Sequence, residues 1–117
     1  MQFSSPRGNP ETKLYRDFKK LVESHGWYIK KTHGSKYQSG LPDVVMWHKT
    51  HGERWVELKT TDGALSTTQI NSFANITKYG GRIWVVRKLD DYKNLFGKPN
   101  WTYYVPGVYS KYVRDSL

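Results

Sequence analysis

An aspartate, a glutamate and a lysine stand in a stretch of sequence that otherwise reads as two β-strands. The stretch SGLPDVVMWHKTHGERWVELKT has Asp43 at the start of its first strand-like run and Glu57 and Lys59 within the second. Clustered carboxylates suit a hard cation such as Mg²⁺. A neighbouring lysine can position or deprotonate a metal-bound water, or stabilise charge that develops on a phosphate. These three residues are therefore the first candidates for a catalytic site.

The two strand-like runs are joined by a short turn at residues 50–52, which predicts an antiparallel hairpin. The start of the first strand would lie beside the end of the second, so Asp43 is expected within a residue or two of Glu57 and Lys59. Side chains alternate between the faces of a strand. The apolar neighbours of Glu57 would then face the helices, while Glu57 and Lys59 share the opposite face.

A third acidic residue stands at the start of the first predicted helix. Glu11 is three residues before Leu14, which places it on the apolar side of the helix, directed at the sheet. A carboxylate in the first turn also favours the helix dipole by roughly 0.3–1 kcal/mol, which explains an acidic residue there but not its orientation. From spacing alone, Glu57 and Lys59 could equally form a solvated strand face, with Asp43 a turn residue.

The rest of the sequence predicts the elements that hold these side chains in place. Asn9 and Pro10 are typical of a helix start and Gly26 of its end, so a helix is expected over residues 10–25. A strand at 27–32 and a polar loop precede the hairpin. A helix, a strand, a helical turn and a further strand follow, at residues 66–81, 82–88, 90–95 and 101–105. This order indicates an α/β or α+β fold with helices packed against one mixed sheet.

Two polar residues at the start of the second helix allow two interpretations. Ser66 and Gln69 have the spacing of a capping box, in which each side chain bonds to the backbone of the other. Gln69 can therefore close the helix N-terminus, or it can support the site. The spacing favours neither.

Composition restricts the class of protein. A chain of 117 residues is expected to form one domain, here 9–117, behind a flexible arm at 1–8. It contains no cysteine, which excludes disulfides and thiolate metal sites and favours an intracellular protein. No segment approaches the length of a membrane span, so no membrane partner is expected.

The formal net charge of +9 predicts a polyanionic partner, and nucleic acid is the first candidate. Each basic residue is, on its own, as well explained as a solvated surface charge. The candidates for phosphate contact are Lys30, Lys31, Lys36, Arg82, Arg87 and Lys88.

The motifs together resemble a known nuclease family. Pro42 and Asp43, followed by the Glu57-Leu58-Lys59 triplet, are similar to the signature of PD-(D/E)XK nucleases. The wider order of an acidic residue opening the first helix, GLPD, VELK, LSTTQ and a WVVR strand resembles the virus-type replication-repair nuclease (VRR-Nuc) family. The resemblance covers about residues 11–88 and leaves the extension at 89–117 without a counterpart.

The resemblance implies a restriction-endonuclease-like fold and a DNA endonuclease that uses Mg²⁺, with Mn²⁺ as a substitute. Glu11, Asp43 and Glu57 would be metal-binding carboxylates, together with the backbone carbonyl of Leu58. Lys59 would orient or activate the attacking water, and Gln69 would support the site.

Stand-alone viral members of this family resemble Holliday-junction resolvases, which implies a homodimer that acts on branched DNA. The implied location is the cytoplasm, which would be that of a bacterial host if the chain is phage-encoded. A domain of this size needs a second copy to cut a four-way junction symmetrically. The alternatives are a less selective or restriction-like nuclease and a non-catalytic basic module that binds nucleic acid. Carboxylates directed at one sheet edge argue against the last, because they repel phosphate unless a cation lies between them.

Overall fold

The predicted order of helix, three strands, helix and strand is confirmed. A computed structural model describes residues 10–32, 40–60, 63–109 and 113. The arm at 1–8, the cap at Asn9 and the phosphate contact at Lys36 therefore lie outside the described residues. The elements are α2 (Pro10–Ser24), β1 (Tyr28–Lys31), β2 (Val44–His48), β3 (Gly52–Leu58), α3 (Thr67–Lys78), β4 (Ile83–Val86) and the 3-10 helices η2 (Leu89–Phe96), η3 (Trp101–Tyr104) and η4 (Gly107–Tyr109).

The four strands form one mixed sheet in the order β1-β2-β3-β4. β2 pairs antiparallel with both β1 and β3. β3 pairs in parallel with β4, and α3 connects these two strands. Val44 lies opposite Val56, so the next pair along the hairpin is Asp43 and Glu57. The register expected from the sequence is therefore confirmed.

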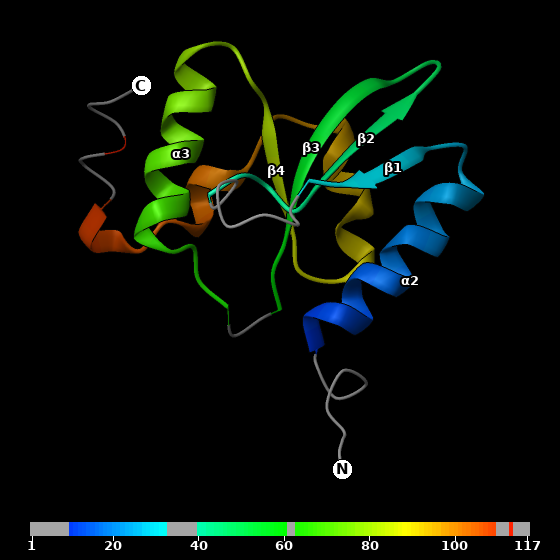
Figure 1. Ribbon diagram of the computed structural model, residues 1–117, viewed down its shortest axis with the longest axis horizontal. Coiled ribbons are helices and arrows are strands. Elements are labelled where there is room, and N and C mark those ends of the chain that lie inside the picture. The colour runs from blue at the N-terminus through cyan, green and yellow to red at the C-terminus, as the bar shows by residue number, and fades with distance from the viewer. Residues whose placement is uncertain (1–9, 33–39, 61–62, 110–112, 114–117) are drawn as a thin grey trace.

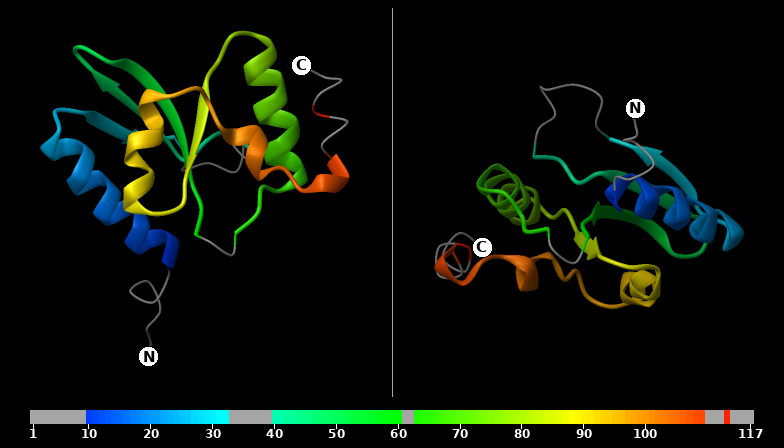
Figure 2. Two further views of the ribbon diagram at one scale, coloured as in Figure 1. Left: turned by 180° about the vertical axis from the view of Figure 1, so that it is seen from behind. Right: turned by 90° about the horizontal axis from the view of Figure 1, so that it is seen from below.

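Helices cover the two faces of this sheet, and a separate apolar cluster lies under each (Figures 1 and 2). α2 packs over one face, where Leu14 and Phe18 meet the inward residues of all four strands. α3 packs over the other face and covers Ile83 and Val85 of β4. None of the helices in the described segments is long and apolar enough to cross a membrane.

The segment that follows β4 wraps around that edge of the sheet from one face to the other (Figure 2). Leu95 of η2 belongs to the cluster beneath α2, whereas Trp101 of η3 belongs to the cluster beneath α3. Both side chains are fully buried, so the chain beyond residue 88 completes both apolar cores.

The strand predicted at residues 101–105 is wrong, and Asn100 is the reason. The Asn100 side chain occupies the outer edge of β4, where its Oδ1 accepts from the Val85 N–H at 2.7 Å and its Nδ2 donates to the Val85 carbonyl at 3.4 Å. A side-chain amide thus takes the place of a fifth strand. The chain turns into the 3-10 helix η3, and Trp101 is buried against α3, donating to Thr77 Oγ1 at 2.9 Å.

Substitution of Asn100 should therefore destabilise the fold. Asn100→Ala leaves the N–H of fully buried Val85 without its acceptor, which costs about 1–3 kcal/mol. The free energy of unfolding in urea measures this loss. Lys98→Ala, at an exposed position two residues earlier, is the control and should leave the unfolding midpoint unchanged. Equal midpoints for the two variants would contradict the assigned role of Asn100.

Candidate active site

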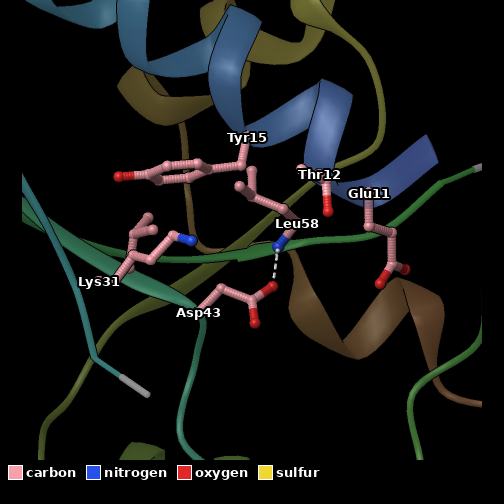
Figure 3. A pocket seen from close by; sticks show the side chains of 7 residues that line it. Glu11, Thr12, Tyr15, Lys31, Asp43 and Leu58 are labelled. Carbon is pink, nitrogen blue, oxygen red and sulfur yellow. Dashed lines mark hydrogen bonds between the residues drawn. The ribbon is translucent and has the colours of Figure 1, made fainter. Parts of the chain in front are cut away.

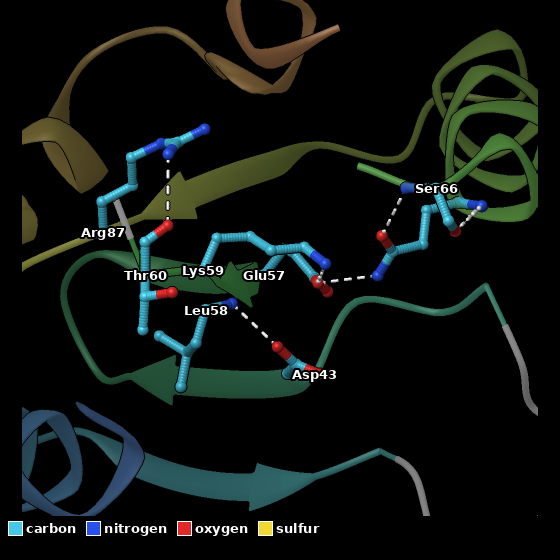
Figure 4. Close-up of polar contacts among 8 residues, drawn as sticks. Asp43, Glu57, Leu58, Lys59, Thr60, Ser66 and Arg87 are labelled. Atoms are coloured by element: carbon cyan, nitrogen blue, oxygen red, sulfur yellow. Dashed lines mark hydrogen bonds and ion pairs between the residues drawn. The ribbon is translucent and has the colours of Figure 1, made fainter. Parts of the chain in front are cut away.

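Glu57 is buried, which excludes the interpretation that it belongs to a solvated strand face. Its residue exposure is 1%, although it lies near the end of β3. Its Oε2 accepts from Gln69 Nε2 at 2.7 Å and lies 3.5 Å from the Lys59 ammonium (Figure 4). Its other oxygen, Oε1, is buried and has no hydrogen-bond partner among the described residues. One half of the carboxylate is thus held firmly, and the other half could accept a further ligand.

Burial and a second acid together raise the pKa of Glu57 to about 8. Desolvation is the larger cause, and the negative charge of Asp43 is the next. Lys59 and Gln69 act in the opposite direction, since both stabilise the ionised form, but they do not outweigh the other two. The positive charge of Lys59 alone therefore does not keep both acids ionised at neutral pH, and a bound cation would add the positive charge that this requires.

Asp43 is held beside Glu57 by the backbone of the neighbouring strand. Its Oδ2 accepts from the Leu58 N–H at 2.9 Å, which fixes the carboxylate at the end of the hairpin (Figure 4). The segment before it is shaped by packing. Gly40 has φ of +93°, and a Cβ there would lie 3.0 Å from the Cβ of Ser72, so only glycine lets this chain approach α3 so closely.

Gln69 makes both of the contacts between which the sequence could not decide. Its Oε1 accepts from the Ser66 N–H at 3.0 Å, and the Ser66 hydroxyl accepts from the Gln69 N–H at 3.1 Å, which completes the capping box. Its Nε2 is left to donate to Glu57. The N-terminus of α3 and the buried carboxylate are thus positioned by one side chain.

Glu11 lies across a pocket from Asp43, on the first turn of α2 (Figure 3). Its side chain is exposed, although its spacing from Leu14 predicted the apolar side of the helix. The first turn of α2 lies beside the chain that leaves β3 (Figure 1). A Cβ on Gly63 would lie 3.2 Å from Lys59 Cδ and 3.5 Å from Glu11 Oε2, so these two side chains flank the same glycine.

The structure brings some of the predicted basic residues to this site and leaves others away from it. Lys31 lines the same pocket, with its ammonium 4.3 Å from the centre of the Tyr15 ring. Arg87 donates to the Thr60 carbonyl at 3.2 Å, and Lys88 lines a second pocket with Thr60.

Lys30 lies on the other face of β1, over the ring of Tyr28. Arg82 precedes the opposite end of β4, beside Trp84. Neither of these two side chains lines the pockets around Asp43 and Thr60.

The donor set suits a divalent cation held by two carboxylates better than a closed protein cage. Within the described ranges, no three acidic or histidine side chains converge closely enough to hold a metal ion between them. Asp43 and Glu57 do lie together, and the buried Oε1 of Glu57 lacks a partner in the described part of the chain. Mg²⁺ is usually bound by one or two carboxylates, with waters and substrate phosphates completing its shell. The residues present therefore fit such an ion.

Comparison with known proteins places this arrangement in a family context. The profile of the VRR-NUC domain matches residues 9–88. A solved structure described as a VRR_NUC domain superposes with a TM-score of 0.64 at 20% identity, covering 75% of this chain and 95% of that one. Hjc, a Holliday junction resolvase from the archaeal hyperthermophile Archaeoglobus fulgidus, superposes with a TM-score of 0.52 at 18% identity, covering 66% and 67%. No curated protein matches the chain.

These two structures confirm the predicted α/β fold with a restriction-endonuclease-like core. Because the sequence identities are low, the two likenesses concern the fold. The match to the domain profile is independent of them and covers all of the candidate site residues discussed above.

The raised pKa of Glu57 predicts a pH dependence of stability in the metal-free protein. Glu57 holds its proton to about pH 8 in the folded state, against 4.5 as the ordinary value, so the folded protein loses stability as pH rises through this window. Glu57→Gln keeps the shape and removes the titration. The free energy of unfolding of Glu57→Gln minus that of the native protein should therefore increase by about 1 kcal/mol or more between about pH 5 and about pH 8.5. Urea unfolding in the presence of a chelator measures both values.

Glu23→Gln, on the exposed side of α2, is the matched control and should show no such increase. A stability difference between Glu57→Gln and the native protein that stays constant with pH would contradict the burial of an ionisable Glu57.

Proposed function

This chain belongs to the VRR-NUC domain family, and from that premise we propose that it is a divalent-metal-dependent DNA endonuclease that cleaves branched DNA. The family is a nuclease family, so hydrolysis of phosphodiester bonds is the reaction class. The metal, the branched substrate and the homodimeric state are the parts that go beyond family membership.

The observation that carries the proposal is the pair of carboxylates on neighbouring strands, in which one buried carboxylate oxygen has no hydrogen-bond partner among the described residues. Asp43 and Glu57 face each other across the hairpin, and Glu57 Oε1 is buried and unpartnered within the described segments. A module that only binds nucleic acid has no use for this arrangement, since the two carboxylates repel phosphate and destabilise the fold. A metal-dependent hydrolase needs it.

We assign Asp43 and Glu57 as the side chains that hold the ion, with the Leu58 carbonyl as a further ligand. Glu11, at the rim of the same pocket, would act through a water molecule, because its side chain is exposed. The cofactor proposed is Mg²⁺, with Mn²⁺ as a substitute. When bound, the ion supplies a water of lowered pKa and offsets charge on the phosphate.

Lys59 is assigned to the attacking water or to the phosphate oxygens. Its ammonium is 3.5 Å from Glu57 Oε2, and its side chain is 15% exposed, so it is restrained but still within reach of the pocket. Gln69 holds the other side of the same carboxylate. The Lys59 ammonium would thus lie beside the Asp43 and Glu57 carboxylates. There it would stabilise the charge of the transition state more than it stabilises the bound substrate.

Branched DNA and a homodimer are proposed from the fold and the size of the domain. The fold is shared with Hjc, which is a Holliday junction resolvase. A single small domain presents one site, and a twofold dimer would present two sites to symmetry-related strands. Lys31, Arg87 and Lys88, which border the site, are the candidate phosphate contacts there.

Cleavage of branched DNA should require Asp43 and Lys59. Native protein is expected to cut a four-way junction in Mg²⁺ or Mn²⁺ faster than a linear duplex of the same sequence. Asp43→Asn and Lys59→Ala should each lower the single-turnover rate by about a hundred-fold or more, with DNA binding retained. Lys78→Ala, which removes an exposed lysine from the last turn of α3, is the charge-matched control.

Flaps and splayed duplexes in the same assay separate the parts of the proposal. Equal cutting of all substrates would favour the less selective or restriction-like nuclease. Failure to cut any substrate with either metal would contradict the enzyme and leave the basic binding module.

Binding of the cation should be measurable without DNA. Saturating Mn²⁺ or Mg²⁺ is expected to stabilise the native protein against unfolding by on the order of 1–3 kcal/mol, because the ion binds only the folded state. Asp43→Asn should abolish the increase, whereas Asp90→Asn, at an exposed acid on η2, should not. An equal metal-induced increase in the free energy of unfolding for all three proteins would show that the ion binds at a site without Asp43.

A further inference from the structure

The face of the sheet that carries Glu57 continues beyond the site as an open surface. Cross-strand partners share a face, so three rows can be followed across β1, β2 and β3. The first row holds Tyr28, Trp47 and Glu53, and the second holds Lys30, Val45 and Trp55. The third row holds Asp43 and Glu57. α3 covers this face at β4 and packs against Trp55, whereas the first row is exposed.

Aromatic rings dominate the exposed row. Tyr28 is 59% exposed and Trp47 is 38% exposed, and their rings stack with centroids 5.8 Å apart. Both tryptophans of the face are tied to one carboxylate. Trp47 Nε1 donates to Glu53 Oε1 at 3.0 Å, and Trp55 Nε1 donates to Glu53 Oε2 at 2.8 Å. The indole rings are therefore held by their N–H edges before any ligand arrives.

We propose that Tyr28 and Trp47 form a platform on which the bases of a single-stranded or unpaired DNA segment stack. Bases of any sequence stack on exposed aromatic rings, and such contacts commonly combine with nearby cations that hold the backbone. Lys30 supplies a cation on the same face, with its ammonium 5.4 Å from the centre of the Tyr28 ring. Rings fixed in advance lose little conformational freedom on binding, which favours affinity.

A nucleic acid suits this surface better than a second copy of the chain. The protein carries a net charge of +9, so two copies repel each other whereas a polyanion is attracted. β1 is the edge strand of the sheet and contains two consecutive lysines, Lys30 and Lys31. Lysines on an edge strand discourage edge-to-edge pairing of sheets.

The platform is connected to the candidate active site along the strands. Trp47 is four residues from Asp43, and Glu53 is four residues from Glu57, which is about 13 Å at roughly 3.3 Å per residue. That span corresponds to about four stacked nucleotides at roughly 3.4 Å each. Taken with the proposed nuclease function, on which this part rests, the platform would hold unpaired bases a few nucleotides from the phosphate at the site.

The test measures DNA binding in a chelator, so that cleavage plays no part. The probes are an oligo-dT strand, an abasic strand of the same length and a blunt duplex. Native protein should bind oligo-dT with quenching of tryptophan fluorescence and bind the abasic strand about ten-fold more weakly. Trp47→Ala and Tyr28→Ala should each lower oligo-dT affinity by a similar factor and change duplex and abasic affinity by less than about two-fold.

Two controls separate stacking from damage to the fold. Trp47→Phe retains an aromatic ring and should retain most of the oligo-dT affinity. Tyr79→Ala removes an aromatic side chain that is 86% exposed at the end of α3 and should change nothing. Urea unfolding of each variant verifies that it is folded before binding is compared.

Each outcome decides the proposal. Unchanged oligo-dT affinity in Trp47→Ala, or an equal loss on the strand, the abasic strand and the duplex, would overturn it. A change in oligomeric state with DNA affinity retained would assign the face to a second copy and overturn it as well. The binding assay contains no metal and measures no cleavage. Failure of the nuclease proposal in the cleavage assay is therefore distinguishable from failure of the platform in the binding assay.

Discussion

The Glu57 carboxylate lies almost fully buried, and its neighbours are another carboxylate, an ammonium group and an amide. Removing an acid from water carries a large free-energy cost that a partner at 3.5 Å and a single hydrogen bond do not offset here, since the pKa of Glu57 still rises to about 8. Much of the surrounding structure bears on this one group. β2 brings Asp43 to it, β3 brings Lys59, and the first turn of α3 brings Gln69.

The fold supports this costly arrangement with well-packed elements on either side. The apolar cluster beneath α2 and the cluster beneath α3 meet at the sheet, and the chain beyond β4 adds Leu95 to one and Trp101 to the other. Asn100 closes the edge of β4 without a fifth strand. The polar site is thereby confined to the open end of the β2–β3 hairpin, between the first turns of the two helices.

Much of this could be predicted from sequence because the relevant signals are local. The capping box at Ser66, the glycine after α2 and the turn at residues 50–52 each specify an element, and strand alternation then places Glu57 and Lys59 on one face. The burial of Glu57 could not be predicted, since it depends on how α3 packs, and the same pattern describes a solvated strand. The strand expected at 101–105 failed for a related reason. Its aromatic residues suit a strand, but the sheet edge was already closed by a side chain just before it.

Aromatic residues illustrate the same limit. Trp47 and Trp84 each follow an apolar residue in a β-strand, yet Trp84 is 1% exposed and Trp47 is 38% exposed. The difference arises because α2 and η2 cover Trp84, whose Nε1 donates to the Gly97 carbonyl, while α3 leaves the first row of β1 and β2 open. Only the assembled structure separates a core ring from one that can meet a ligand.

The most direct measurement of the central claim is single-turnover cleavage of a four-way junction by Glu57→Gln in saturating Mg²⁺. This substitution keeps the size of the side chain, removes its negative charge and replaces one carboxylate oxygen with an NH₂ donor. Urea unfolding of the variant therefore accompanies the rate measurement, to verify that it is folded. We expect a folded protein that binds the junction and cuts it at least about a hundred-fold more slowly than the native protein. A rate equal to that of the native protein would contradict the claim that this buried carboxylate is present for catalysis.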